Sequence, residues 1–307
     1  MPETPFSVRP DLLEDLNISF VADAPLGALT WYRTGGHAAL LASPANTAQL
    51  AELVGRCHER QVPLRVLGAG ANLLVRDEGV DAVVVRLDAE NFKQIQIDAK
   101  NHTLTAGAGV DLFKLVPASA RAGLAGLVHV AGIPATAGGA VRMNAGGAFG
   151  DIGESVGRVQ VMSEAGQVYY RDRDDLEFGY RQTNITAPLI LEIEFALDEA
   201  DPEALMKRYK EIYLYKKNSQ PMGDKSAGCC FKNPGEEVGV PAGKLIDQAG
   251  LKGFSVGGAK VSDLHANFVV ADPARATSAD VLAVIEHVQD VVAQRHGVRL
   301  EREVVVW

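Results

Sequence analysis

Cysteine is scarce in this chain of 307 residues, and its three cysteines, Cys57, Cys229 and Cys230, do not follow a zinc-ligand spacing. An odd number of cysteines, two of them adjacent, does not indicate a disulfide framework, so a reducing compartment fits best. Long apolar runs are also missing, and residues 1–17 are acidic and contain proline instead of an apolar signal core. We therefore expect a cytoplasmic protein with no membrane span and no metal site.

Basic residues are also fewer than acidic residues. The chain has 30 Lys and Arg residues against 39 Asp and Glu residues, which gives a formal net charge of -9. A general nucleic-acid binder needs a basic face that displaces counterions, so this class of protein is not expected. A local cluster of Lys and Arg can still outweigh the global charge, which leaves an anionic small-molecule substrate compatible with the composition.

The rest of the composition is that of a globular protein, with 47% hydrophobic and 22% charged residues. At roughly 100–150 residues per domain, the length fits two or three domains. Apolar periodicity predicts an α+β chain without repeated βαβ units. The expected helices are 46–58, 111–122, 202–217, 241–249 and 278–294. The expected strands are 64–67, 82–87, 103–106, 159–162, 167–170 and 189–195, with a last apolar strand at 297–307 that returns to the first domain.

Two glycine-rich segments stand out. Residues 66–74 run from a strand into a turn of Gly and Ala, and small residues let backbone N–H groups approach phosphate oxygens. Residues 132–147 contain five glycines, which suits close approach of the backbone to a flat or phosphorylated ligand. The alternatives are an ordinary tight turn and a loop-rich crossover. Because neither segment has a Walker lysine, the pair points to a dinucleotide held between domains.

Polar residues elsewhere are weaker signals when each is taken alone. The pair Tyr180-Arg181 is more typical of a protein surface than of a site. Four lysines in residues 216–232 could receive a phosphorylated substrate, and the alternative is a solvated linker. The apolar sequence of residues 229–231 indicates that this loop is packed. Glu303 enters an apolar terminal strand, where an edge charge is the simpler interpretation.

Taken together and in this order, these and further motifs resemble those of the UDP-N-acetylenolpyruvoylglucosamine reductase (UDP-N-acetylmuramate dehydrogenase) family of peptidoglycan precursor synthesis. The resemblance covers nearly the whole chain, from about residue 30 to residue 306. It is carried by residues 33–36, 68–74, 132–139, 143–146, 179–181, 226–228, 231–234, 242–246, 251–253, 265–268 and 303–304.

The resemblance implies a vanillyl-alcohol-oxidase-type two-domain FAD-binding fold plus a C-terminal α+β substrate-binding domain. Residues 1–88, with the returning strand 297–307, and residues 89–216 would hold FAD between them without a covalent bond. Residues 217–296 would cover the substrate. The short stretch between Tyr180 and Lys217 indicates the form of the family that lacks a tyrosine-bearing substrate loop. We expect a monomer.

The resemblance also implies the reaction. NADPH reduces FAD, and the flavin N5 then gives a hydride to C3 of UDP-N-acetylglucosamine enolpyruvate. The resulting enolate is protonated at C2 to give UDP-N-acetylmuramate. Arg181 matches the arginine of the family and Glu303 its glutamate, which would stabilise the enolate. Cys229 stands where the family commonly has serine, the proton donor.

Further matches assign binding residues. Those implied to bind the cofactor are Arg33, Gly68, Ala69, Gly70, Ala71, Asn72, Leu73, Gly132, Ile133, Pro134, Thr136, Gly138, Gly139 and Asn144. Those implied to bind the substrate are Tyr180, Lys217, Gly228, Lys232 and Asn233.

Three departures from the family pattern matter. Ala135 stands where the family usually has glycine, His129 follows Val128 in place of a Glu-aromatic pair, and Cys229 changes the acidity and size of the donor. We expect His129 to be a packing residue.

Two other functions remain open, an FAD-linked oxidase of the same fold and a non-catalytic nucleotide-sugar or flavin-binding protein. Against the oxidase, the segment around residues 68–72 has no His or Cys for covalent flavin attachment. Against the binding protein, both Arg181 and Glu303 are present.

Overall fold

The computed structural model describes residues 6–307, which form two compact units. Unit 1 comprises the chain up to residue 24 together with residues 39–69 and 81–215. Unit 2 comprises residues 25–38, 70–80 and 216–307. Each unit buries a hydrophobic cluster of its own. The three-domain division expected from the resemblance stays a prediction.

A four-stranded sheet in the order β1-β2-β5-β3 lies mainly in unit 1. The strands are β1 (Ser19–Ala24), β2 (Ala38–Ser43), β5 (Val80–Val85) and β3 (Leu64–Val66). The predicted helix beside it is α1 (Thr47–Glu59), which begins after Asn46, whose side chain accepts a hydrogen bond from the backbone N–H of Gln49 at 3.0 Å. The side chains of residues 82–85 are buried, which confirms that this apolar stretch forms an interior strand.

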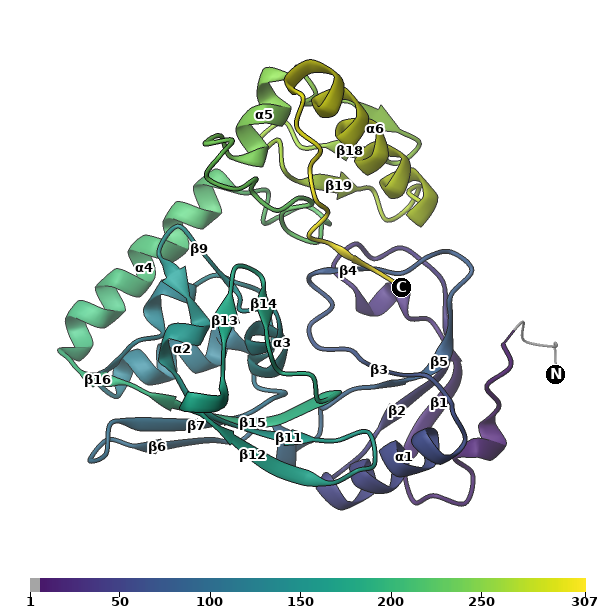
Figure 1. The fold of residues 1–307 in the computed structure, drawn as a ribbon, viewed down its shortest axis with the longest axis vertical. Helices are drawn as coiled ribbons and strands as arrows, with labels where there is room; N and C mark the ends of the chain where they lie inside the picture. Colours follow the sequence, from purple (N-terminus) through teal and green to yellow (C-terminus); the bar gives the residue numbers. More distant parts are fainter. Residues whose placement is uncertain (1–5) are drawn as a thin grey trace. The chain divides into compact units, whose positions relative to one another are not determined.

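A five-stranded antiparallel sheet in the order β12-β11-β15-β7-β6 forms the larger part of unit 1 (Figure 1). The strands are β12 (Val168–Asp172), β11 (Val156–Met162), β15 (Leu189–Ala196), β7 (Thr103–Gly107) and β6 (Ile95–Asp98). The predicted helix α2 (Leu112–Arg121) begins after Asp111, whose carboxylate accepts from the N–H of Phe113 at 2.9 Å.

Helix α3 (Ala137–Arg142) was not expected from the sequence, which suggested only a glycine-rich stretch at this place. The helix is short and contains two glycines, which lower helix propensity. Gly138 is nevertheless required, because a Cβ there would lie 2.7 Å from the Cβ of Ala108. The side chain of Thr136 caps the helix by accepting from the N–H of Gly139 at 3.3 Å.

Short elements complete unit 1. Residues 1–30 were expected as an extended arm with a helical turn; residues 1–5 lie outside the described part, and residues 19–24 instead form the edge strand β1. The two-residue pairs are β8 (Leu124–Ala125) with β16 (Asp198–Glu199), β9 (Gly146–Gly147) with β10 (Gly150–Asp151), and β13 (Phe178–Gly179) with β14 (Gln182–Thr183). The 3-10 turns of the chain are Pro10–Leu12, Gly27–Leu29, Glu90–Phe92, Val128–Val130, Ile152–Ser155 and Arg173–Asp175.

Helix α4 (Pro202–Ser219) runs out of unit 1 into unit 2, where the remaining predicted helices are α5 (Ala242–Gln248) and α6 (Ser278–His296). Helix α6 packs on an antiparallel sheet of β17 (Ser255–Val256), β18 (Ala259–Val261) and β19 (Val269–Ala271), as Figure 1 shows. In residues 6–307, no helix is long and apolar enough to cross a membrane.

The terminal strand is much shorter than the eleven residues expected. Only β20 (Val305–Val306) forms, and it pairs in parallel with β4 (Leu73–Leu74). The residues just before it are used elsewhere, because Arg302 makes a bridge with Phe231. The chain end therefore links the first glycine-rich loop to the segment that contains the cysteine pair.

Candidate active site

The two glycine-rich loops meet in unit 1. A Cβ at Gly68 would lie 2.8 Å from the hydroxyl oxygen of Thr136, so only glycine allows the loops to approach this closely. Thr136 is the cap of α3, and the N–H of Gly138 donates to the carbonyl of Ala108 at 2.9 Å. The structure therefore brings together residues of both predicted cofactor loops. Residues 68, 69 and 71, like Asn72, are half-buried.

The later part of the first loop lies in unit 2, beside the chain end. Gly70 has a φ of 66° and a Cβ there would lie 2.6 Å from the carbonyl oxygen of Leu29. The side-chain amide of Asn72 donates to the carbonyl of Glu303 at 3.3 Å. The backbone N–H of Val305 donates to the carbonyl of Asn72 at 3.1 Å. A predicted cofactor residue is thus adjacent to a predicted catalytic residue.

Arg181 occupies a tight turn between β13 and β14, where it has a φ of 58°. Its Nη2 donates to the carbonyl of Gly146 at 3.0 Å, and its Nη1 lies 3.7 Å from a carboxylate oxygen of Asp151. The guanidinium also lies over the ring of Tyr180, at 4.9 Å from the centroid. The side chain is only 14% exposed, so the cation is held at a fixed place in a partly desolvated environment.

Asn144 supports the turn that carries Arg181. Its side chain is 3% exposed, its Oδ1 accepts from the N–H of Gly153 at 3.0 Å, and its Nδ2 donates to the carbonyl of Gly179 at 2.9 Å. Its φ of 43° lies in the left-handed region, which asparagine tolerates better than most residues. The sequence resemblance assigned Asn144 to the cofactor, whereas these contacts are to the backbone of the chain itself.

Asp151 was missed in the sequence, although an acidic residue in a glycine-rich stretch is a usable signal. Burial raises the pKa of its carboxyl group, and the nearby charge of Arg181 acts in the opposite direction. The ring Nε2 of His129 lies 3.0 Å from the backbone oxygen of Asp151. His129 therefore contacts the β9–β10 hairpin, and its expected packing role stays a prediction. Phe149, in the turn of this hairpin, packs edge-on against Tyr215 of α4.

In unit 2 the cysteine pair lies beside the chain end. The N–H of Glu303 donates to the carbonyl of Cys230 at 2.8 Å. Cys230 is 1% exposed and its sulfur lies 3.8 Å from the hydroxyl oxygen of Tyr32, so it is a core residue, as the sequence predicted. Burial raises the pKa of the Cys230 thiol to about 11. Cys229 is half-buried and is therefore the more exposed residue of the pair.

The predicted substrate residues near the cysteines have partners in unit 2. Gly228 has a φ of 75°, which favours glycine immediately before Cys229. The Nζ of Lys232 lies 2.5 Å from a carboxylate oxygen of Glu301, and the Oδ1 of Asn233 accepts from the first N–H of α5 at 3.1 Å.

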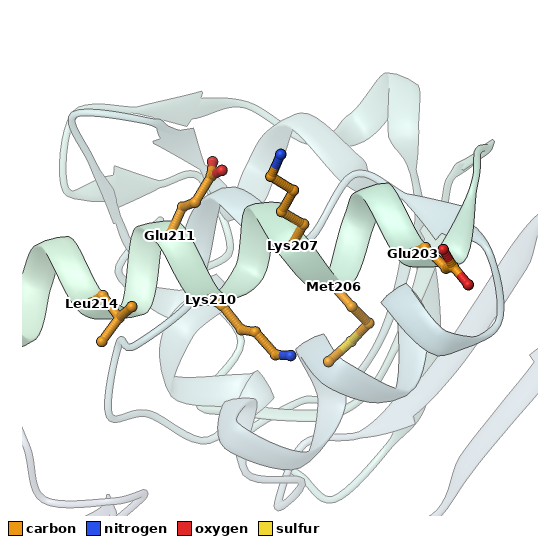
Figure 2. Close-up of a pocket in the computed structure, with 6 residues that line it drawn as sticks. All are labelled: Glu203, Met206, Lys207, Lys210, Glu211 and Leu214. Carbon is orange, nitrogen blue, oxygen red and sulfur yellow. The ribbon is translucent and has the colours of Figure 1, made fainter.

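Other predicted residues are on the surface. Lys217 and Arg33 are exposed, as is Tyr180 at 46%. A shallow pocket elsewhere lies along one face of α4 and contains none of the predicted residues (Figure 2). Its lining residues are Glu203, Met206, Lys207, Lys210, Glu211 and Leu214. Within residues 6–307, no group of three or more His, Cys, Asp or Glu side chains could hold a metal ion.

Comparison with known proteins first shows the structural class of the chain. The family model described as "FAD binding domain" matches residues 38–170. A chitooligosaccharide oxidase has the same fold over 62% of this chain and 43% of its own, with a TM-score of 0.50 and 15% sequence identity. The chain therefore has the FAD-binding fold of the vanillyl-alcohol-oxidase type, as the sequence motifs predicted.

The family follows from longer matches. The model described as "UDP-N-acetylenolpyruvoylglucosamine reductase, C-terminal domain" matches residues 220–307. The UDP-N-acetylenolpyruvoylglucosamine reductase of Desulfosudis oleivorans is 42% identical over 294 residues, which cover 92% of this chain and 93% of the relative. The crystal structure of the Thermus caldophilus reductase of that name has a TM-score of 0.79, with 37% identity over 94% of this chain and 98% of its own. The chain belongs to the UDP-N-acetylenolpyruvoylglucosamine reductase family, which confirms the family that its motifs indicated.

Proposed function

We propose that this protein uses FAD and NADPH to reduce UDP-N-acetylglucosamine enolpyruvate to UDP-N-acetylmuramate, a step of peptidoglycan precursor synthesis. The observation that carries the proposal is the fixed guanidinium of Arg181 in a chain that belongs to this reductase family. The reaction places negative charge on the substrate carboxylate, and a cation held in place before the reaction stabilises that charge most effectively.

The glycine-rich loops fit FAD, because Gly68 approaches Thr136 closely and residues 68 and 69 are only half-buried where the two loops meet. We infer that Gly68 and Thr136, with the neighbouring residues named from the sequence, hold it. When bound, FAD supplies the hydride for the enolpyruvyl double bond. No covalent link is expected, so acid denaturation should release yellow cofactor into the supernatant. Flavin that stays with the precipitated chain would contradict this expectation.

Arg181 and Glu303 have complementary tasks at the substrate. The guanidinium pairs with the substrate carboxylate and stabilises the enolate form that follows addition of the hydride to C3. The contacts of Arg181 with Gly146 and Asp151 keep the guanidinium oriented before the substrate arrives. Glu303 works with it at the enolate end.

Cys229 donates the proton that C2 requires. Cys229 is half-buried, whereas Cys230 is buried and its thiol lies beside Tyr32. A thiol is a stronger acid than the hydroxyl of a serine and is able to donate in its place. Tyr180, Lys217, Gly228, Lys232 and Asn233 bind the nucleotide sugar.

The discriminating experiment measures NADPH oxidation by the purified protein with and without the enolpyruvyl nucleotide. We expect oxidation that depends on the nucleotide and forms UDP-N-acetylmuramate. Rapid oxidation with oxygen alone would indicate an FAD-linked oxidase, and bound flavin without turnover would indicate a binding protein. We also propose that the protein is a cytoplasmic monomer.

A further inference from the structure

The motif at residues 265–268 was singled out in the sequence without a role, and it contains one of the most buried polar side chains of unit 2. Asn267 is 3% exposed. Its Oδ1 accepts from the N–H of Phe231 at 3.0 Å, and its Nδ2 donates to the carbonyl of Phe231 at 2.8 Å. Its own carbonyl accepts from the N–H of Cys230 at 2.8 Å. One residue thus supplies the contacts that a neighbouring strand would otherwise make.

The other edge of the same segment is paired with the chain end. The carbonyl of Cys230 accepts from the N–H of Glu303 at 2.8 Å, and the N–H of Lys232 donates to the carbonyl of Glu301 at 2.9 Å. Residues 230–232 are therefore held along both edges. Cys229 precedes this segment directly, so the direction of its thiol depends on how the segment is held.

Asn267 is itself well fixed. Its backbone N–H donates to the Nδ1 of His265 at 3.2 Å, and the ring of His265 packs edge-on against Phe268 at 4.8 Å between centroids. A Cβ at Gly243 of α5 would lie 3.3 Å from the ring of His265. The asparagine is thus presented to Phe231 from a turn that rests on a helix.

We propose that Asn267 is a positioning residue for the thiol of Cys229. It acts through the backbone of Phe231 and Cys230 and is not assigned any contact with substrate or FAD. The inference rests on the proposed function, in which Cys229 is the proton donor. Only an amide offers both a donor and an acceptor in this geometry; a carboxylate of the same shape keeps the acceptor, loses the donor and faces the carbonyl of Phe231.

The test is a double-mutant cycle measured in single turnover, with reduced enzyme mixed with the enolpyruvyl nucleotide. Asn267→Asp should slow substrate reduction by about 10- to 100-fold, the scale of a small misplacement of a reacting group. The double variant Asn267→Asp, Cys229→Ala should reduce the substrate no more slowly than Cys229→Ala alone. Asn267 affects the reaction only through Cys229, so its substitution has no further effect once the thiol is gone. Reduction of the flavin by NADPH should be unchanged in all variants.

A second readout does not depend on turnover. The rate at which iodoacetamide labels Cys229, followed by mass spectrometry, should change in Asn267→Asp. The matched control is Asn144→Ala, because Asn144 is equally buried and clamps two backbone groups of unit 1. That variant should label Cys229 at the wild-type rate. Thermal unfolding establishes that each variant is folded, and Asn267→Ser replaces Asn267→Asp if the latter does not fold.

The possible failures are distinguishable. Wild-type substrate reduction in Asn267→Asp, or effects that multiply in the double variant, would overturn the positioning role. Wild-type substrate reduction in Cys229→Ala would instead overturn the assignment of the proton donor, and with it this part of the proposed function.

Discussion

In unit 1, Arg181 lies in a left-handed turn and two side chains, those of Asp151 and Tyr180, contact its guanidinium beside the carbonyl of Gly146, whereas in unit 2 Cys229 precedes a segment held mainly by backbone groups. The turn of Arg181 depends on the amide of Asn144 and the carboxylate of Asp151. The segment after Cys229 depends on the main chain of residues 301–303, and Asn267 is the side chain that adds to it. A side-chain support can be removed by one substitution, whereas a backbone support cannot. Single substitutions should therefore disturb the arginine more readily than the cysteine.

The largest expected effect is at Cys229. Cys229→Ala should lose roughly 10²–10⁴-fold in substrate reduction, the usual contribution of a positioned acid, while reduction of the flavin by NADPH survives. Cys229→Ser should keep substantial turnover because it restores a protic group of similar reach. Cys230→Ala is the matched control, and it should mainly lower stability because Cys230 is a core residue. Single-turnover kinetics would contradict the assignment if Cys229→Ala matched the wild type.

Removing the side chain of Asn144, which supports the turn of Arg181, should lower the free energy of unfolding and slow substrate reduction. Asn144→Ala leaves the buried N–H of Gly153 and the half-buried carbonyl of Gly179 without their side-chain partner, and a buried group left in this state costs about 1–3 kcal/mol. We expect a lower midpoint of urea unfolding together with slower substrate reduction. Unchanged stability would mean that water replaces the amide and that the turn is not held as described.

The contact between the two glycine-rich loops can be broken without touching a charged group. Gly68→Ala places a Cβ 2.8 Å from the hydroxyl oxygen of Thr136, and overpacking of this kind costs about 1–3 kcal/mol. If the loops hold FAD, its dissociation constant should rise about tenfold or more in a titration of the apoprotein. Gly55→Ala is the control, because Gly55 lies outside both loops and a Cβ there would have no neighbour closer than 4.0 Å. Equal affinity in both variants would exclude the loop contact from the cofactor site.

The smallest effect expected is a difference in reactivity among the cysteines. Burial raises the pKa of Cys57 and that of Cys230 to about 11, so at pH 8 only about one of these thiols in a thousand is ionised. Iodoacetamide should therefore label Cys229 first, with the other two following only as the pH rises toward 11. The folded state holds these two protons more tightly than the unfolded chain does. Stability should consequently fall as the pH rises from about 8.5 to 11. Early labelling of Cys230 would contradict the description of unit 2.

Much of the fold could be predicted from the sequence because its signals are local. A capping asparagine and the spacing of apolar residues predict helix α1, and a long apolar periodicity predicts α6. Helix α3 could not be predicted, because the glycines that its packing requires are also helix-weakening residues. The strand at the chain end was overestimated because its residues pair with two different partners, Arg302 with Phe231 and residues 305–306 with β4.

The site could be predicted only where single residues match a family motif. The contact of Arg181 with Asp151 joins residues that are thirty positions apart, and the clamp of Asn267 on Phe231 joins residues thirty-six positions apart. Neither pairing leaves a periodic signal in the sequence. Sequence resemblance gives the position of a residue and not the partners of its side chain, so the contacts of Asn144 with Gly153 and Gly179 could not be predicted, and its assignment to the cofactor stays a prediction.

The most direct test of the account separates the two half-reactions in Arg181→Ala and Glu303→Ala. Each variant is first reduced by NADPH and then mixed with the enolpyruvyl nucleotide, and the flavin absorbance is followed in both steps. We predict that NADPH still bleaches the flavin at the wild-type rate, while reoxidation by the nucleotide slows by at least ~10²-fold, the scale of losing one oriented charge-stabilising group. Equal losses in both half-reactions would contradict the account and would show that these residues serve the fold instead of the substrate.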